Sequence, residues 1–302
     1  MTILWIVATV VVSVLFIYAV LLALVAWISV RPPRMPQFVT PGLMGEEHDT
    51  LSIGTSDGLS LRAWWVPCEG ETTAIFAHGY FTNRCEFVPF VTRFKARKVS
   101  SLLFDHRAHG TSTGKICTFG VDEVLDVQAA VNWVKQQRPG QKIVLVGNSM
   151  GALACALYAA QEPEGIHGLI LDSPYARVDE GARGWWSFFA RGRFKHLLRP
   201  TAMFGKLFCP ADLGSIDLEH AVAKIRDIPM IFMFGEHDPL ISKEKTERCL
   251  QAAGPMAKVV WFPDANHARA RFREPEKYAE ALFSFLEDNK LGEKPTSPVL
   301  AP

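Results

Sequence analysis

An uninterrupted apolar segment occupies residues 3–30, where no side chain is charged and Val, Leu, Ile and Ala predominate. A helix rises about 1.5 Å per residue, so this segment is long enough to cross a hydrocarbon core about 30 Å thick. Trp5 and Trp27 lie near its two ends, where interfacial aromatic side chains are enriched. The pattern predicts a single transmembrane helix. A buried core helix and a cleavable signal peptide are the alternatives, and the lack of a basic region before the apolar run disfavours the signal peptide.

The residues after the apolar segment predict its orientation and its connection to the next domain. Arg31 and Arg34 flank only the downstream end. Because positive charge favours the cytoplasmic side, we expect the rest of the chain to face the cytoplasm. Three prolines between residues 32 and 36 favour extended backbone and block helix. Residues 31–50 are therefore predicted to form a short, stiff linker that holds the next domain near the bilayer.

From residue 51 onward, short apolar runs typical of strands alternate with longer helical stretches. Strands over 51–55 and 59–67 flank Ser56-Asp57-Gly58, a hairpin turn signal. Further strands then alternate with helical stretches such as 121–137 and 275–289. This alternation is typical of an α/β fold with a mostly parallel central sheet and helices on both faces.

The α/β domain is predicted to cover residues 51–290, a length sufficient for one well-buried domain. Residues 291–302 are rich in Pro and small residues and are predicted to form a disordered tail. The formal net charge is +1, which gives no indication of a nucleic-acid partner. Six cysteines are scattered without a framework spacing, which favours a reducing compartment.

A serine lies at the centre of Gly147-Asn148-Ser149-Met150-Gly151, between the apolar run 143–146 and the helix-like stretch 152–157. This G-x-S-x-G turn between strand and helix exposes the serine oxygen, and its glycines leave room for a strained backbone and close packing. A glycine-rich surface turn is the alternative interpretation. The preceding strand and following small-residue helix favour a nucleophilic serine instead.

Two further predicted strands end in loops that carry acid and base candidates. The strand 230–234 is followed by Asp238, and the strand 259–262 is followed by His267. The carboxyl ends of parallel strands share one edge of a sheet, so both side chains are expected at the edge that holds Ser149. A serine nucleophile needs a proton acceptor, and the acceptor needs a group that fixes it.

Two other carboxylates are alternatives to Asp238. Asp172 ends the predicted strand 169–171, and Asp264 lies three residues before His267. Both positions are also typical of aspartates that cap turns, which favours Asp238 as the acid.

The order Ser149, Asp238, His267 is that of the α/β-hydrolase triad and differs from the orders in chymotrypsin and subtilisin. The chain from Leu51 to Leu286 therefore resembles the α/β-hydrolase superfamily, in particular its serine-esterase and serine-aminopeptidase-like branch, which includes membrane-anchored members. The resemblance implies that Ser149 is the nucleophile, His267 the general base and then acid, and Asp238 the residue that orients the imidazole.

The segment His78-Gly79-Tyr80-Phe81 follows a predicted strand over 73–77 and resembles the oxyanion loop of this family. The resemblance implies that the backbone N–H groups of Tyr80 and Met150 bind the oxyanion, a task that does not depend on their side chains. His78 is expected to be structural rather than catalytic.

The segment from Asp105 to Ser112 contains His106 and His109, which raises the possibility of metal ligation. It also resembles the D-x-R-G-x-G-x-S loop of the family, whose polar groups brace the turn beneath the site, with Ala108 in place of the usual Gly. No set of carboxylates and cysteines with a recognisable spacing accompanies the two histidines. We therefore predict no metal ion and no cofactor.

A cap insertion is predicted over about residues 177–215, where the core sheet needs no further elements and α/β hydrolases usually carry a cap. It interleaves aromatic and basic side chains. One interpretation is a packed cover with solvated arginines. The other is an acyl pocket whose basic face meets anionic lipid headgroups. The side chains concerned are Trp185, Trp186, Phe188, Phe189, Phe194, Leu197 and Leu198, with Arg177, Arg183, Arg191, Arg193, Lys195 and Arg199.

Together these features predict a membrane-anchored serine hydrolase that cleaves carboxylic esters or thioesters through an acyl-enzyme, with lipid-like substrates favoured because the anchor confines it to a bilayer. A serine peptidase of the same fold is the first alternative, since the same triad cleaves amides. A noncatalytic binding protein is the second, because fold does not fix function. Retention of all three triad candidates disfavours it. The sequence predicts neither the acyl length nor the oligomeric state.

Overall fold

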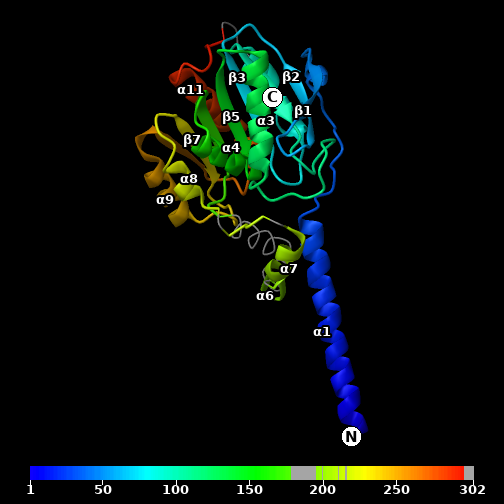
Figure 1. Ribbon diagram of the computed structural model, residues 1–302. Helices are drawn as coiled ribbons and strands as arrows, with labels where there is room; N and C mark the ends of the chain where they lie inside the picture. Colours follow the sequence, from blue (N-terminus) through cyan, green and yellow to red (C-terminus); the bar gives the residue numbers. More distant parts are fainter. Residues whose placement is uncertain (178–194, 199, 210, 215, 296–302) are drawn as a thin grey trace.

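The computed structural model describes residues 1–177, 195–198, 200–209, 211–214 and 216–295, which form one eight-stranded sheet covered by helices (Figure 1). The strand order is β1-β2-β4-β3-β5-β6-β7-β8. β2 runs antiparallel to β1 and β4, and the pairings from β4 through β3, β5, β6 and β7 to β8 are parallel. The predicted mostly parallel α/β fold is confirmed. The strands are β1 (Asp49–Gly54), β2 (Ser60–Val66), β3 (Thr72–Ala77), β4 (Val99–Phe104), β5 (Lys142–Asn148), β6 (Ile166–Asp172), β7 (Met230–Gly235) and β8 (Ala257–Phe262).

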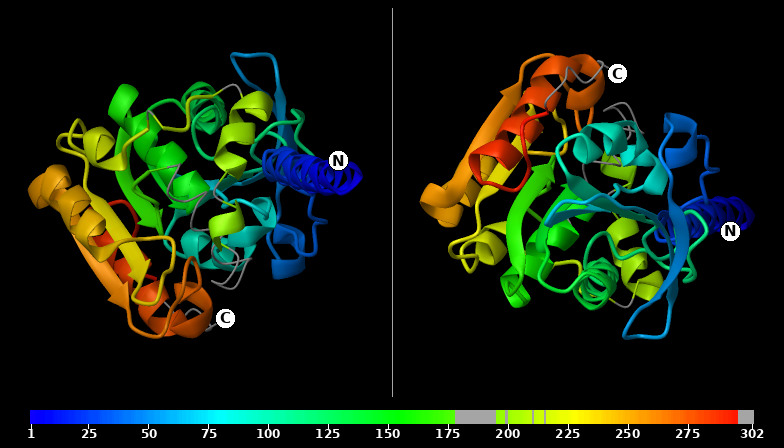
Figure 2. Two further views of the ribbon diagram at one scale, coloured as in Figure 1. Left: turned by 90° about the horizontal axis from the view of Figure 1, so that it is seen from below. Right: turned by 90° about the horizontal axis from the view of Figure 1, so that it is seen from above.

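Helices cover both faces of the sheet, as the views along it show (Figure 2). The strand interiors are apolar on both sides because successive side chains alternate between the faces. In β4, Leu102 and Phe104 join one core cluster and Leu103 joins the other. Residues of α3 (Glu123–Gln137), α4 (Met150–Gln161), α8 (Leu218–Val222) and α9 (Lys243–Ala253) pack in the first cluster, and residues of η2 (Arg84–Phe90), α2 (Val91–Lys95) and α11 (Pro275–Asp288) pack in the second.

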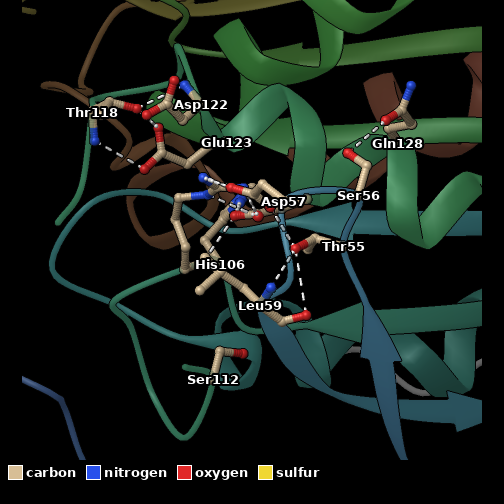
Figure 3. Close-up of polar contacts among 12 residues, drawn as sticks. Thr55, Ser56, Asp57, Leu59, His106, Ser112, Thr118, Asp122, Glu123 and Gln128 are labelled. Atoms are coloured by element: carbon tan, nitrogen blue, oxygen red, sulfur yellow. Dashed lines mark hydrogen bonds and ion pairs between the residues drawn. The ribbon is translucent and has the colours of Figure 1, made fainter. Parts of the chain in front are cut away.

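The predicted turn at Ser56-Asp57-Gly58 joins β1 to β2. Gly58 has φ 86°, a left-handed conformation that glycine adopts without strain. The Thr55 hydroxyl donates to Asp57 Oδ1 at 2.5 Å and accepts the Leu59 N–H at 2.9 Å (Figure 3). These bonds hold the Asp57 carboxylate toward the loop that follows β4, where it accepts Arg107 Nη1 at 2.8 Å.

The apolar N-terminal segment forms helix α1 (Thr2–Ser29), which projects away from the sheet domain (Figure 1). It is 28 residues long and carries no charged side chain, so it is long and apolar enough to cross a membrane. Most of its large apolar side chains are exposed, whereas Leu22 and Ala26 near its carboxyl end are buried. A helix that packs in the core of a soluble protein would bury this surface.

The end of α1 is joined to the domain by hydrogen bonds that begin at its last residue. The Tyr80 hydroxyl donates to the carbonyl of Ser29. The Cys117 N–H donates to the carbonyl of Val30 at 2.8 Å, and the Val30 side chain is buried. No length of free chain therefore separates the helix from the domain.

The segment after α1 is also attached to the domain. The Arg34 guanidinium donates to carbonyls in the loop that follows β4, with distances between 2.6 and 3.1 Å. Farther along, η1 (Pro41–Met44) precedes β1. At the other end of the chain, the structure describes residues 291–295 of the predicted tail, and Leu291 is buried. The remainder of that tail lies outside the described residues.

A short bridge pairs Arg177, at the start of the predicted cap, with Asp217, two residues beyond its predicted end, and their side chains are 3.6 Å apart. Within it, the structure describes α6 (Lys195–Leu198) and α7 (Thr201–Phe208). α7 lies beside α1, and the Tyr18 hydroxyl of α1 donates to the carbonyl of Leu197 in α6. The other aromatic and basic cap residues singled out from the sequence, Trp185, Trp186, Phe188, Phe189, Phe194, Arg183, Arg191, Arg193 and Arg199, lie outside the described residues.

Candidate active site

Ser149 lies in the turn between β5 and α4, with φ 50° and ψ −110°. Its N–H donates to the carbonyl of Asp172 at 2.7 Å, which ties the turn to the end of β6. The flanking glycines are required by close packing. A Cβ on Gly151 would lie 2.1 Å from the carbonyl oxygen of Ala77, and a Cβ on Gly147 would meet the backbone of α4 at 2.4 Å. The sequence therefore folds into a strained turn that only glycine permits on both sides.

We expect Gly151→Ala to reduce turnover at least about 100-fold, because the added methyl group forces β3 and α4 apart and displaces reacting groups by a fraction of an ångström or more. Steady-state kinetics on an activated ester would measure the loss. Gly54→Ala is the matched control, since a Cβ there meets nothing within 4 Å and its turnover should stay near that of the parent. Equal turnover in both variants would contradict the close packing.

Ser149, His267 and Asp238 come together at the carboxyl edge of the sheet. Ser149 Oγ lies 2.8 Å from His267 Nε2, and His267 Nδ1 lies 2.7 Å from Asp238 Oδ2. A carboxylate only accepts hydrogen bonds, so the Nδ1–H donates to Asp238 and Nε2 accepts from the serine hydroxyl. The Asp238 side chain is 2% exposed, and its other oxygen accepts the Leu240 N–H at 2.8 Å. This arrangement can take the serine proton and hold the imidazolium that forms.

The alternative acids have other partners. Asp172 accepts the Ser173 hydroxyl at 2.9 Å and the Tyr278 hydroxyl at 3.0 Å, and both bonds stabilise the end of β6. Burial raises the pKa of Asp172. Asp264 lies in the turn after β8, where its N–H donates to Glu274 at 3.2 Å. The His267 Nδ1–H instead donates to Asp238.

The loop after β3 lies against the serine turn. A Cβ built on Gly79 would lie 3.6 Å from Ser149 Cβ, and the Gly79 N–H donates to Glu86 Oε2 at 2.8 Å. Phe81 has φ 65°, which turns the chain sharply just after Tyr80. Met150 is the first residue of α4, so its N–H has no acceptor one turn earlier in the helix. The amides of residues 80 and 150 thus belong to two segments that flank Ser149.

A buried ionic network connects the loops around the serine, and sequence analysis did not identify it. Glu86 Oε1 accepts from both Asn148 Nδ2 and Arg271 Nη2. Arg271, in α10 (Ala270–Arg273), also lies 3.7 Å from Asp172 Oδ2. The side chains of Glu86 and Arg271 are 4% and 9% exposed. Glu86, which follows β3, therefore links Asn148 beside Ser149 to Arg271 in the segment that follows His267, and Arg271 extends the network to the end of β6.

A second buried cluster lies behind the loop after β3 and consists of His78, His106 and His109. The Nδ1–H of His78 donates to the Gly79 carbonyl at 2.7 Å, and its Nε2 accepts the His106 N–H at 2.9 Å. His106 Nδ1 lies 3.2 Å from Asp126, and the His109 Nδ1–H donates to a carbonyl at 2.8 Å. All three rings are fully buried. They act as fixed hydrogen-bonding groups of the loops, in agreement with the structural role expected for His78.

The loop after β4 is fixed by the polar residues that resemble the family pattern. Asp105 accepts the backbone N–H and the side chain of Arg84, at 2.9 and 2.5 Å. Ala108 has φ 61°, a conformation that favours glycine, which explains why glycine is usual at this position. Farther along, Glu123 accepts the Thr118 hydroxyl at 2.8 Å and so closes the turn before α3 (Figure 3).

We expect the folded state to lose stability steeply as the pH falls from about 6.5 toward 4. Burial lowers the pKa values of His78 and His109 to about 4 and that of His106 to about 3. Above pH 6.5 these rings are neutral in both states, whereas below it the unfolded chain alone takes up protons, so unfolding becomes easier. Burial raises the pKa of Asp126 to about 6 and also raises that of Asp172, which offsets part of this uptake.

The net effect is a slope on the order of 2 kcal/mol per pH unit between pH 6 and 5. Urea unfolding of the detergent-solubilised chain at several pH values would measure it. A free energy of unfolding that is constant from pH 7 to 5 would contradict the buried, neutral state of these histidines.

Comparisons with known proteins agree with this fold. The sequence profile of the family described as serine aminopeptidase S33 matches residues 70–205, and that of the dienelactone hydrolase family matches residues 188–285. The protein YfhR of Escherichia coli O157:H7, itself described as uncharacterized, is 25% identical over 90% of this chain and 92% of its own. A Monkeypox virus protein described as a monoglyceride lipase homolog is 26% identical over 65% of this chain and 68% of its own.

Among solved structures, the esterase Pf2001 of Pyrococcus furiosus has a TM-score of 0.74 and 29% sequence identity, covering 87% of this chain and 98% of its own. The sheet, the strand-turn-helix around Ser149 and these matches define an α/β hydrolase. The chain has the α/β-hydrolase fold, and these matches relate it to serine-esterase-like members of that superfamily. The resemblance inferred from the sequence is confirmed, and hydrolysis is the class of reaction that follows.

Proposed function

We propose that this protein is a membrane-anchored serine hydrolase that cleaves carboxylic esters or thioesters, with acyl or lipid-like substrates. The observation that carries the proposal is the hydrogen-bonded chain from Ser149 Oγ to His267 and on to Asp238, with distances of 2.8 and 2.7 Å. A hydroxyl beside a neutral, oriented imidazole is activated for attack on a carbonyl carbon.

The mechanism follows from these contacts. As Ser149 Oγ bonds to the acyl carbon, its proton moves to His267 Nε2, and Asp238 stabilises the imidazolium. The N–H groups of Tyr80 and Met150 stabilise the negative oxygen of the tetrahedral intermediate. His267 then gives the proton to the leaving alcohol or thiol, and an acyl-enzyme remains. Water, deprotonated by the same imidazole, releases the acid and restores Ser149.

Two further observations support the substrate class and the anchor. The relatives named above include an esterase and a monoglyceride lipase homolog, which supports ester cleavage. Helix α1, with its uncharged 28-residue length, supports anchoring by a single span.

The positive charges of Arg31 and Arg34 support a cytoplasmic position of the domain. Protection of the domain from protease outside intact cells is the expected result, and its digestion there would contradict this orientation.

A fluorophosphonate probe tests the nucleophile directly. The full chain in detergent should be labelled on Ser149, and Ser149→Ala should not be labelled. The full chain is needed because Ser29 and Val30 provide acceptors to the domain, so removal of residues 1–30 would alter the loop that carries Tyr80. Turnover of p-nitrophenyl esters of graded length would then report the acyl pocket. Absence of labelling in a folded chain would overturn the mechanism.

A serine peptidase is the second candidate, because the family profile that matches residues 70–205 is described as serine aminopeptidase S33. The same three side chains would attack an amide carbonyl. Comparing turnover of acyl esters with that of aminoacyl amides separates the two candidates. Cleavage of amides alone would replace the esterase proposal, whereas cleavage of esters alone would exclude the peptidase.

A further inference from the structure

Helices α6 and α7 expose apolar side chains beside α1. Leu197, Met203 and Leu207 are 52%, 75% and 73% exposed. Met203 and Leu207 are four residues apart in α7, so they share one helical face, while Thr201 at the start of the helix is buried. The helix contains one lysine and no acidic residue. Such a face is the kind that amphipathic helices bury in a lipid surface.

The position of α6 along α1 gives the depth of this face. Tyr18, whose hydroxyl donates to the Leu197 carbonyl, lies eleven positions before Ser29 in the sequence, or about 16 Å along the helix axis. The 28 residues of α1 extend about 42 Å, which equals the thickness of a bilayer with its headgroups. When α1 spans the bilayer with Ser29 at the outer surface of the headgroups, the headgroup layer takes up about 6 Å of this distance. The contact at Tyr18 then lies about 10 Å inside the hydrocarbon core.

The candidate active site faces the same side. The Tyr80 hydroxyl reaches the last carbonyl of α1 from the loop at the carboxyl end of β3, the edge of the sheet that also holds Ser149 and His267. α1, α6 and α7 all extend from this end of the domain (Figure 1). A bilayer crossed by α1 therefore lies against the catalytic edge rather than beside the back of the domain.

We propose that α6 and α7 dock in the bilayer leaflet nearest the domain, and that the site takes acyl esters of lipids from that leaflet. The inference rests on the proposed anchoring by α1 and deepens the proposed ester hydrolysis. We assign the lipid bilayer as the partner of the exposed face of α7, because α7 lies beside α1 and extends the apolar surface of that helix, which is long enough to span a membrane. The substrate then reaches Ser149 without leaving the membrane surface.

Nitroxide labels on the full chain in phosphatidylcholine and phosphatidylglycerol vesicles test the docking without any enzyme assay. Met203→Cys is compared with Met256→Cys, which is partly exposed at the amino end of β8, the opposite edge of the sheet. Both are made with Cys68→Ser and Cys85→Ser, since the other native cysteines are buried. We expect oxygen to relax the label at 203 more than a water-soluble nickel chelate does, and the reverse at 256.

Three results would overturn docking. The first is equal nickel accessibility at both labels. The second is spin-spin broadening at position 203 that disappears on dilution with unlabelled chain, because it indicates that a second copy covers the face. The third is release of the chain from the vesicles by alkaline carbonate, because it shows that α1 does not anchor the protein in the bilayer.

An activity ratio tests the substrate source. In Met203→Glu/Leu207→Glu, the rate on a long-chain ester held in vesicles, divided by the rate on a water-soluble acetate ester, should fall about tenfold. Met256→Glu should leave the ratio within about twofold. An unchanged ratio in the double variant would overturn delivery from the leaflet. Hydrolysis of neither ester by the parent chain would instead refute the proposed function, while the nitroxide labels still decide docking.

Discussion

Ser149→Ala is expected to lower kcat for an activated ester by about a millionfold. Ser149 Oγ is the atom that would bond to the acyl carbon. Without it, His267 Nε2, which lies 2.8 Å from Oγ in the parent, has no nucleophile to deprotonate. Residual turnover of about 10³- to 10⁴-fold over water is expected from oxyanion stabilisation and binding. Burst and steady-state kinetics of the full chain in detergent would measure the loss.

The controls distinguish loss of chemistry from loss of fold. Ser56→Ala changes an exposed hydroxyl in the β1–β2 turn and should keep parental turnover. His267→Ala should match Ser149→Ala, and the double variant should be no worse than either, because the two groups act as one unit. Asp238→Asn should cost about 10⁴-fold. More than 1% of parental turnover in Ser149→Ala would identify another nucleophile.

Arg271→Met is expected to lower the free energy of unfolding by about 3–5 kcal/mol, because it leaves the buried carboxylates of Glu86 and Asp172 without their common cation. The side chains of Glu86 and Asp172 are 4% and 1% exposed, so water cannot replace the guanidinium. Turnover should also fall, since the ion pair that joins the segment after β3 to the segment after His267 is lost. Urea unfolding followed by tryptophan fluorescence would report the change in stability.

A matched variant of an exposed ion pair shows how much of the loss in stability is due to the burial of the Arg271 network. Lys258→Met breaks the pair between Lys258 and Asp288, in which both side chains are about 60% exposed, and should change stability by less than about 1 kcal/mol. Adding Glu86→Gln to Arg271→Met should restore part of the stability, because a neutral amide tolerates the apolar neighbour better than a carboxylate. Equal losses in Arg271→Met and Lys258→Met would contradict the buried network.

The parts of the site that depend on topology could be predicted from the sequence. Ser149, Asp238 and His267 each follow an apolar run, and parallel strands bring their carboxyl ends to one edge. A residue that directly follows a strand is therefore expected at the carboxyl edge of the sheet. The structure brings the three side chains within hydrogen-bond distance for this reason.

The buried network could not be predicted in the same way. Glu86 and Arg271 are 185 positions apart, and each lies in a short helical segment where a charged residue is ordinarily solvated. Their burial arises only when η2 and α10 pack beside the same end of the sheet. The hydrogen bond from Tyr80 to Ser29 could not be predicted from the sequence either, since a proline-rich segment after an apolar helix is typical of a linker that makes few contacts.

The backbone of Ser149 has a consequence for how this chain responds to selection. Its φ of 50° and ψ of −110° belong to a region that costs a non-glycine residue about 1–3 kcal/mol. Glycine at this position would remove most of that strain and the hydroxyl together, so Ser149→Gly should unfold at higher denaturant than the parent or Ser149→Ala. Directed evolution for thermal tolerance alone would thus enrich inactive chains at this codon, and a stabilising screen of this protein needs a simultaneous demand for turnover.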